Sequence, residues 1–241
     1  MALLTVADLS VELAGADGPL TVLRQVGFTL ERSRILGIVG ESGSGKTMTA
    51  LALMSLLPEG ARASGSIRLD GRELLGLAEA ELCERRGDRV AMIFQEPMTA
   101  LNPLQTIGRQ VAEPLRLHRA VASGAAWEEA VRLLGRVHLR DPERLAAAFP
   151  HQLSGGQRQR AMIAMALAGG PDLLLADEPT TALDVTLQAQ ILELLDELFA
   201  NPRHPYTQGL IRSIPRIDLD AEHKTRLEAI GGSVPILINP P

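Results

Sequence analysis

The sequence predicts an α/β fold, a sheet-forming body with a helical insert, and three observations predict it. Residues 4–13 alternate apolar and polar side chains, as a half-buried strand does, and residues 21–30 are typical of a second strand. Short apolar runs at residues 35–39, 90–94 and 173–178 are typical of buried strands. Between the last two runs the apolar residues fall at helical spacing, which predicts that helices interrupt the sheet-forming part of the chain.

The middle and the end of the chain differ from the sheet-forming part in residue pattern. In the middle, one amphipathic stripe with charged residues around it predicts a helix, and it consists of Ala130, Val131, Leu133, Leu134 and Val137. Near the end, closely spaced prolines leave little room for long elements, so we expect a tail over the surface of the body. The expected units are residues 1–97 (a β-subdomain with the first part of the core), 98–150 (a helical subdomain), 151–200 (the remaining core motifs) and 201–241 (the tail).

The composition of the chain excludes several classes of protein. Its 29 Asp and Glu residues outnumber 24 Lys and Arg, and the resulting net charge of -5 argues against broad electrostatic capture of nucleic acid. A single cysteine, Cys83, rules out a disulfide framework within the chain and fits a reducing compartment. No apolar run approaches the roughly 18 residues of a membrane span, and the N-terminus carries no basic leader. We therefore expect a cytosolic chain without a transmembrane segment or a signal peptide.

One segment carries a complete phosphate-binding motif, G-x-x-x-x-G-K-[ST], between an expected buried strand and an expected helix. In such a loop the backbone N–H groups turn inward around a phosphate chain, and the helix N-terminus adds a positive dipole end. Lys46 supplies a charge for the β- and γ-phosphates, and the Thr47 hydroxyl suits Mg²⁺; the alternative is a glycine-rich turn with a chance lysine. The expected nucleotide-binding residues are Gly40, Glu41, Ser42, Gly43, Ser44, Gly45, Lys46 and Thr47.

Two carboxylates follow the apolar run that begins at residue 173. An acid at the carboxyl end of a parallel strand projects into the crevice where ligands bind. Asp177 is therefore placed to hold Mg²⁺ through water, and Glu178 is placed to polarise an attacking water as a general base. The alternative is a solvated acidic turn before Pro179, which the phosphate loop upstream disfavours.

A second glycine motif, at residues 153–157, opens another expected helix. Ser154 is a natural N-cap, and capping is the structural alternative to a functional role. Capping does not explain the adjacent Gly155 and Gly156, because glycines lower helix stability and permit close backbone approach. The helix start therefore predicts a second anion site, and two anion sites in one chain suggest a nucleotide clamped between two subunits.

In this order along the chain, the phosphate loop, LSGGQ at 153–157, LLLADE at 173–178 and ALD at 182–184 resemble the motifs of an ATP-binding subunit of the ABC type. The resemblance implies a P-loop NTPase (RecA-like) core with an antiparallel β-subdomain and a helical insert, and it implies ATP and Mg²⁺ as cofactors. It also implies that Gln95 touches Mg²⁺ and the lytic water, and that two subunits pair head to tail. In such a pair the nucleotide of the partner subunit would be contacted by Ser154, Gly155, Gly156, Gln157 and Asp184.

Further segments narrow the resemblance to one branch of the family. Residues 94–103, 184–191, 201–207 and 232–235 look like the ATP-binding subunits of oligopeptide, dipeptide and nickel importers. This implies a subunit that hydrolyses ATP to power import of peptides or nickel across the inner membrane. The implied partners are a second ABC ATPase subunit, two membrane permease subunits and, indirectly, a solute-binding protein, with no nucleic acid. The implied location is peripheral, on the cytoplasmic face of that membrane.

The chain departs from this family after Asp184. Members of the family have a further apolar strand that ends in a switch histidine, followed by more strands. Here one apolar helical face at 187–198 is followed at once by the proline-rich tail. We therefore expect that an internal deletion has removed the switch histidine and the last core strands. His204 lies in the tail, and we interpret it as a surface-loop imidazole. A nucleotide-binding subunit without hydrolysis is therefore the alternative function. An ABC ATPase acting on DNA or ribosomes is a third, which the acidic balance opposes.

Overall fold

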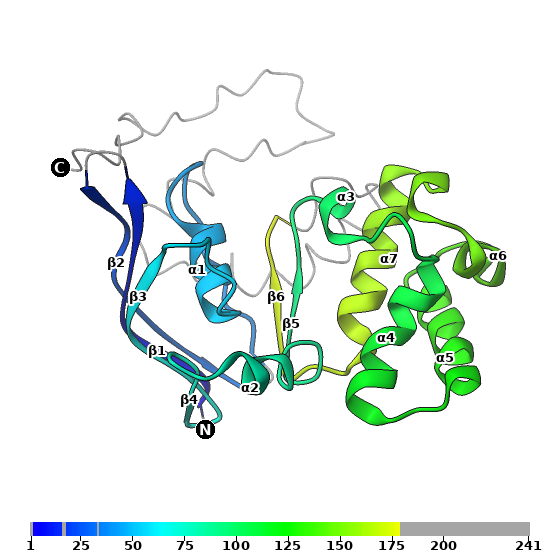
Figure 1. Ribbon diagram of the computed structural model, residues 1–241, viewed down its shortest axis with the longest axis horizontal. Helices are drawn as coiled ribbons and strands as arrows, with labels where there is room; N and C mark the ends of the chain where they lie inside the picture. The colour runs from blue at the N-terminus through cyan, green and yellow to red at the C-terminus, as the bar shows by residue number, and fades with distance from the viewer. Residues whose placement is uncertain (1, 16–17, 33, 179–241) are drawn as a thin grey trace, which may run out of the picture.

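The computed structural model of the chain describes residues 2–15, 18–32 and 34–178. Its elements form a β-subdomain, a short core sheet and a group of helices, which follow one another across the molecule in Figure 1. Asp184, the expected helix at 187–198, His204 and the expected tail lie outside the described residues. The predictions made for them therefore stay predictions.

The β-subdomain is a four-stranded antiparallel sheet in the order β2-β1-β3-β4, which confirms the predicted class of this part. Its register pairs Leu4 with Leu30 in the hairpin of β1 and β2, as the alternation of side chains requires. On the face toward α1, Leu9 and Ile67 are fully buried and pack in one cluster with Leu53 of that helix. The elements are β1 (Ala2–Gly15), β2 (Gly18–Glu31), α1 (Lys46–Leu53), β3 (Arg62–Leu69), β4 (Arg72–Glu73) and the short helix α2 (Glu79–Cys83).

The core sheet consists, among the described residues, of two parallel strands, β5 (Val90–Ile93) and β6 (Leu173–Ala176). Their register pairs Val90 with Leu173 and Ile93 with Ala176, although about 80 residues of chain separate the two strands. All four residues of β5 are buried, as the apolar run predicted. One face of this sheet packs on α7 through a separate apolar cluster, which comprises Ala91, Ile93, Met162 and Ala166.

The prediction of a buried strand at residues 35–39 is wrong. Residues 34–41 have no regular secondary structure, and the side chains of Ile35 and Ile38 are 52% and 47% exposed. An apolar strand becomes buried only when neighbouring strands pair with it and helices cover its faces. Within the described part of the chain, β6 pairs with β5 and neither strand pairs with this segment, so its backbone remains irregular.

The helical insert packs around its own apolar cluster. The predicted stripe is confirmed, because Ala130, Leu133 and Leu134 are buried against Ile107 and Val111 of the preceding helix. Helix α7 contributes residues to this cluster as well as to the core sheet, so it joins the two parts; the boundary at residue 150 stays a prediction. The elements are α3 (Pro97–Ala100), α4 (Ile107–Arg119), α5 (Ser123–Arg136), α6 (Pro142–Ala147), the 3₁₀ helix η1 (Pro150–Gln152) and α7 (Gly155–Ala168).

An ion-pair network ties the β-subdomain to the core sheet. Asp70, in the turn between β3 and β4, pairs with Arg32 after β2 and with Arg89 before β5, the latter at 2.9 Å. Both arginines also pair with Asp172, which directly precedes β6. The hydrogen bond from Arg32 holds the pKa of the Asp70 carboxyl below its usual value, although burial acts in the opposite direction.

We expect the substitution Asp70→Asn to lower the melting temperature at neutral pH and to have little effect in acid. Because the pKa of Asp70 is lower in the folded chain, the ionised carboxylate stabilises the fold above the unfolded value, 3.8. That stabilisation is lost as the pH falls through the folded pKa, where wild type and variant converge. Thermal unfolding at about pH 7 and about pH 3 measures the effect. Glu59→Gln, at an exposed position, is the control, and an equal loss for Asp70→Asn at both pH values would contradict the prediction.

Candidate nucleotide-binding site

The predicted phosphate loop leads directly into α1. Gly45 is the N-cap of this helix and adopts a left-handed conformation, with φ at 90°. A Cβ atom at this position would lie 2.5 Å from Leu23 Cδ2, so glycine is required both for the backbone angle and for the packing against β2. The first N–H groups of a helix have no partner within the helix and attract an anion. The helix expected after the loop is therefore present, whereas the buried strand expected before it is not.

Lys46 folds back over the loop that precedes it. Its Nζ donates hydrogen bonds to the carbonyl oxygens of Gly40 and Glu41, both at 2.9 Å. Thr49 of α1 also contacts the loop, because its Oγ1 and its N–H both donate hydrogen bonds to the carbonyl oxygen of Gly45. The ammonium group is thus held at the loop, where a phosphate oxygen can replace a carbonyl oxygen as its acceptor.

The carboxyl ends of the core strands bring Gln95 and Glu178 into direct contact. Nε2 of Gln95 donates a hydrogen bond to Oε2 of Glu178 at 2.8 Å, although 83 residues separate them in sequence. The parallel register explains this contact, because each residue lies two positions beyond the last pair of the two strands, Ile93 with Ala176. The amide thereby orients the carboxylate that the sequence predicts as a general base.

Asp177 is the buried member of the acidic pair. The residue is only 7% exposed, and its backbone N–H donates a hydrogen bond to the carbonyl oxygen of Ile93 at 3.0 Å. In Figure 1 the N-terminus of α1 and the carboxyl ends of β5 and β6 lie at the same end of the molecule. Mg²⁺ prefers oxygen ligands, and this end of the molecule offers the Thr47 hydroxyl, the Gln95 amide and the Asp177 carboxylate.

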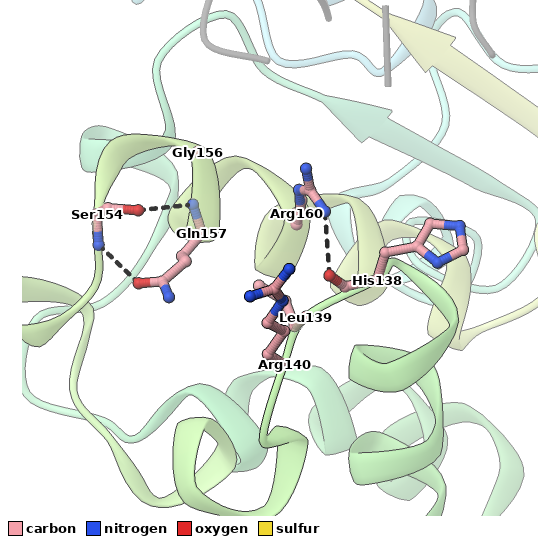
Figure 2. A pocket seen from close by; sticks show the side chains of 7 residues that line it. All are labelled: His138, Leu139, Arg140, Ser154, Gly156, Gln157 and Arg160. Carbon is pink, nitrogen blue, oxygen red and sulfur yellow. Dashed lines mark hydrogen bonds between the residues drawn. The ribbon is translucent and has the colours of Figure 1, made fainter. Parts of the chain in front are cut away.

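The second glycine motif begins α7, and its capping role is confirmed. Ser154 Oγ accepts a hydrogen bond from the N–H of Gln157 at 3.3 Å, and Gln157 Oε1 accepts one from the N–H of Ser154 at 2.9 Å (Figure 2). Gly155 is exposed, and no atom lies within 4 Å of the position of a Cβ there. The side chains of this motif thus cap the helix, while its glycines leave the helix start accessible to a ligand.

One residue that supports the phosphate loop had no signal in the sequence. Nε and Nη2 of Arg86 donate to the carbonyl oxygens of Met54 and Ser55, each at 2.8 Å, at the carboxyl end of α1. The guanidinium also pairs with Glu79. Arg86 therefore holds the far end of the helix whose N-terminus carries the loop, and only the tertiary structure reveals it.

We expect Gly45→Ala to destabilise the fold more than Gly43→Ala, which is its matched control. Both glycines have a positive φ, which raises the energy of a non-glycine residue by about 1–2 kcal/mol. Only Gly45 has atoms in the way of a Cβ, so its variant should lose about 2–4 kcal/mol of unfolding free energy in urea titrations. Equal losses for the two variants would contradict the packing argument.

Comparison with known proteins defines the class of this chain. The family model described as "ABC transporter" matches residues 23–181, and "Oligopeptide/dipeptide transporter, C-terminal region" matches residues 194–241. The chain therefore belongs to the ABC transporter family. Among solved structures it is similar to the dimeric ATP-binding cassette MJ0796 bound to ADP and Pi, with a TM-score of 0.70 and 30% sequence identity over 81% of this chain and 82% of that one. The fold is thus that of a P-loop ATPase cassette, as the motifs predicted.

The chain is similar in sequence to curated ATP-binding proteins of peptide transporters. It is 43% identical to the oligopeptide transport ATP-binding protein OppD of Escherichia coli, across 100% of this chain and 83% of that protein. It is 42% identical to a probable peptide ABC transporter ATP-binding protein of Sinorhizobium fredii, across 99% of this chain and 84% of that protein. The OppD of Bacillus subtilis is also 42% identical, over 99% and 78% of the two chains.

The alignments are longer than the chain itself. The alignment with the Escherichia coli protein runs over 282 positions, whereas the chain has 241 residues. Part of the relative's sequence therefore has no counterpart here, as an internal deletion requires. Its place after Asp184 stays a prediction, because residues beyond 178 are outside the described part of the chain. Among the helices that the structure does describe, none is long and apolar enough to cross a membrane.

Proposed function

We propose that this chain is the ATP-hydrolysing subunit of an ABC importer for peptides. The observation that carries the proposal is the 42–43% identity to peptide-transport ATP-binding proteins across essentially the whole chain. The match of residues 194–241 to the oligopeptide and dipeptide transporter model favours peptides over nickel. In this function the chain lies at the cytoplasmic face of the inner membrane with two permease subunits, a second ATPase subunit and, indirectly, a solute-binding protein. The peptide itself contacts those membrane and binding proteins.

Each motif has one role in this proposal. The loop at residues 40–47 surrounds the β- and γ-phosphates of ATP, and Lys46 supplies the charge that neutralises them. Thr47, Asp177 and Gln95 would hold Mg²⁺, which would supply positive charge to offset the negative charge of the phosphates. Glu178, oriented by Gln95 through the 2.8 Å hydrogen bond, accepts a proton from the attacking water. The contacts to a nucleotide on the partner subunit are assigned to Ser154, Gly155, Gly156, Gln157 and Asp184.

Steady-state phosphate release tests the proposal. The full chain is assayed with MgATP, first alone and then with an intact ABC ATPase subunit of the same importer class. We expect saturable, Mg²⁺-dependent release that increases when the partner is added. A chain that binds MgATP saturably but releases no phosphate in either arm would instead be the nucleotide-binding subunit without turnover. The absence of saturable MgATP binding by folded protein would contradict the proposal altogether.

A further inference from the structure

Residues 35–39, which lead into the phosphate loop and are called the entry segment below, are apolar and exposed. Ile35, Leu36, Ile38 and Val39 are 38–52% exposed, and their backbone has no regular secondary structure. β-Branched residues such as isoleucine and valine favour strands, and burial of apolar side chains stabilises a fold. The entry segment therefore has the composition of a buried strand but, in the described part of the chain, neither the pairing nor the burial of one.

Strand β6 has an edge at which a further strand can pair. Within residues 2–15, 18–32 and 34–178, β6 pairs with β5 on one side and with no strand on the other. The N–H and C=O groups along such an edge form hydrogen bonds with a strand that reaches it. Leu174 of β6 is 40% exposed, whereas all four residues of β5 are buried. Of the two strands, β6 is thus the less covered.

The two ends of the entry segment lie at the two ends of β6. Before its start, Arg32 pairs at 3.7 Å with Asp172, which directly precedes β6. After its end, the chain passes through Gly40 into the loop before α1, whose N-terminus lies at the same end of the molecule as the carboxyl end of β6 in Figure 1. Five extended residues span about 17 Å, which is enough to follow the four residues of β6. Their pairing would be parallel, as it is between β5 and β6.

Helices cover both faces of the sheet that the entry segment would extend. On one face, Leu173 of β6 packs in a cluster with Leu53 of α1. On the other face, Ile93 of β5 packs in a cluster with Met162 of α7. Because side chains alternate between the two faces of a strand, those of a paired entry segment would be buried on either face. That burial would offset the conformational entropy lost when the segment is ordered.

Lys46 connects the entry segment to the phosphate-binding site. Its Nζ donates one hydrogen bond to the carbonyl oxygen of Gly40, the first residue after the segment, and another to that of Glu41. A phosphate oxygen that accepts from this ammonium competes with both carbonyl groups, because a charged acceptor forms the stronger hydrogen bond. Phosphate binding would therefore release the backbone at the end of the segment, while Thr49 keeps its hydrogen bond to Gly45 at the helix end of the loop.

We infer that binding of a triphosphate in the phosphate loop is coupled to pairing of the entry segment with the edge of β6 that faces away from β5. The inference rests on the proposed function for the identity of the ligand, MgATP. Each event stabilises the other, because phosphate releases Gly40 from Lys46, and the paired strand fixes Gly40 at the start of the loop. The measured affinity for MgATP then includes the free energy of ordering the segment. Side chains of the segment thus change this affinity although they lie outside the motif.

Hydrogen exchange followed by mass spectrometry on the full chain tests the pairing. We expect the amides of residues 35–40 to exchange quickly without nucleotide and at least about tenfold more slowly with saturating MgATP. Residues 59–61, which follow α1 and lie outside the loop and the segment, are the control and should not change. Protection of the entry segment without nucleotide would mean that another part of the chain or a second copy already occupies the edge, and it overturns the inference. Unchanged exchange with bound MgATP overturns it as well.

A substitution within the segment distinguishes coupling from a purely structural role. Ile38→Asn replaces a half-exposed side chain, so we expect little change in the melting temperature without nucleotide. The same variant should bind MgATP about tenfold more weakly, because the paired strand would bury the asparagine amide. Leu56→Asn, at a residue 39% exposed outside the loop and the segment, is the matched control and should leave both quantities unchanged.

The outcomes of this comparison are distinct. A lower melting temperature of Ile38→Asn with unchanged affinity for MgATP, or equal effects of Ile38→Asn and Leu56→Asn, overturns the inference and leaves MgATP binding by the parent chain intact. Absence of saturable MgATP binding by the folded parent chain contradicts the proposed function, and the inference with it.

Discussion

Replacing Lys46 with alanine is expected to abolish saturable binding of MgATP, and phosphate release with it. The Nζ group lies 2.9 Å from two carbonyl oxygens of the loop, which holds the ammonium at the place where we propose that the phosphates bind. A hydrogen bond to a charged group contributes about 1.5–3 kcal/mol, so loss of the contacts to two phosphates weakens binding about a hundredfold or more. Titration with a fluorescent ATP analogue in the presence of Mg²⁺ measures the change.

The Lys46→Ala variant must be shown to fold. Helix α1 is anchored by buried Thr49, Ala52 and Leu53, and the acceptors that Lys46 leaves are backbone carbonyls at a loop that water reaches. We therefore expect a melting temperature within a few degrees of the parent chain. Arg144→Ala, at an exposed position on α6, is the control for removal of a positive charge elsewhere. A folded Lys46→Ala chain with nearly unchanged affinity for ATP would contradict the assignment of the phosphate loop.

The substitution Glu178→Gln is expected to reduce phosphate release while MgATP binding remains. Glutamine has the same shape as glutamate and can still accept the hydrogen bond from Gln95, but it cannot take a proton from water. Loss of a general base typically lowers a rate about 10²–10⁴-fold, so we expect a fall of at least about a hundredfold. Steady-state phosphate release and the fluorescent ATP titration, on the same protein, separate the two effects.

The control for this substitution is Glu113→Gln, which removes an exposed carboxylate from α4. It should leave both phosphate release and ATP binding as they are in the parent chain. If Glu178→Gln lowered ATP affinity and phosphate release in the same proportion, Glu178 would be a binding residue rather than the base. If it changed neither quantity, another group would activate the water, and the role given to Glu178 would be wrong.

The features that the sequence alone determined are those that depend on local interactions. The phosphate loop depends on glycine φ angles and a helix start within residues 40–47, and the cap of α7 depends on Ser154 and Gln157, three residues apart. The alternation in residues 4–13 likewise placed β1 correctly. Such features can be predicted from the sequence because the interacting groups lie within a few residues of one another, so their spacing is enough to identify them.

The tertiary structure decided what depends on distant partners. The irregular, exposed run at 35–39 looks like a buried strand in sequence, but burial requires neighbouring strands that the run does not itself encode. The contact of Gln95 with Glu178 depends on the register of β5 against β6. The support of α1 by Arg86 likewise arises where separate segments meet. Sequence spacing fixes geometry only along one element, whereas the packing of the whole chain fixes it between elements.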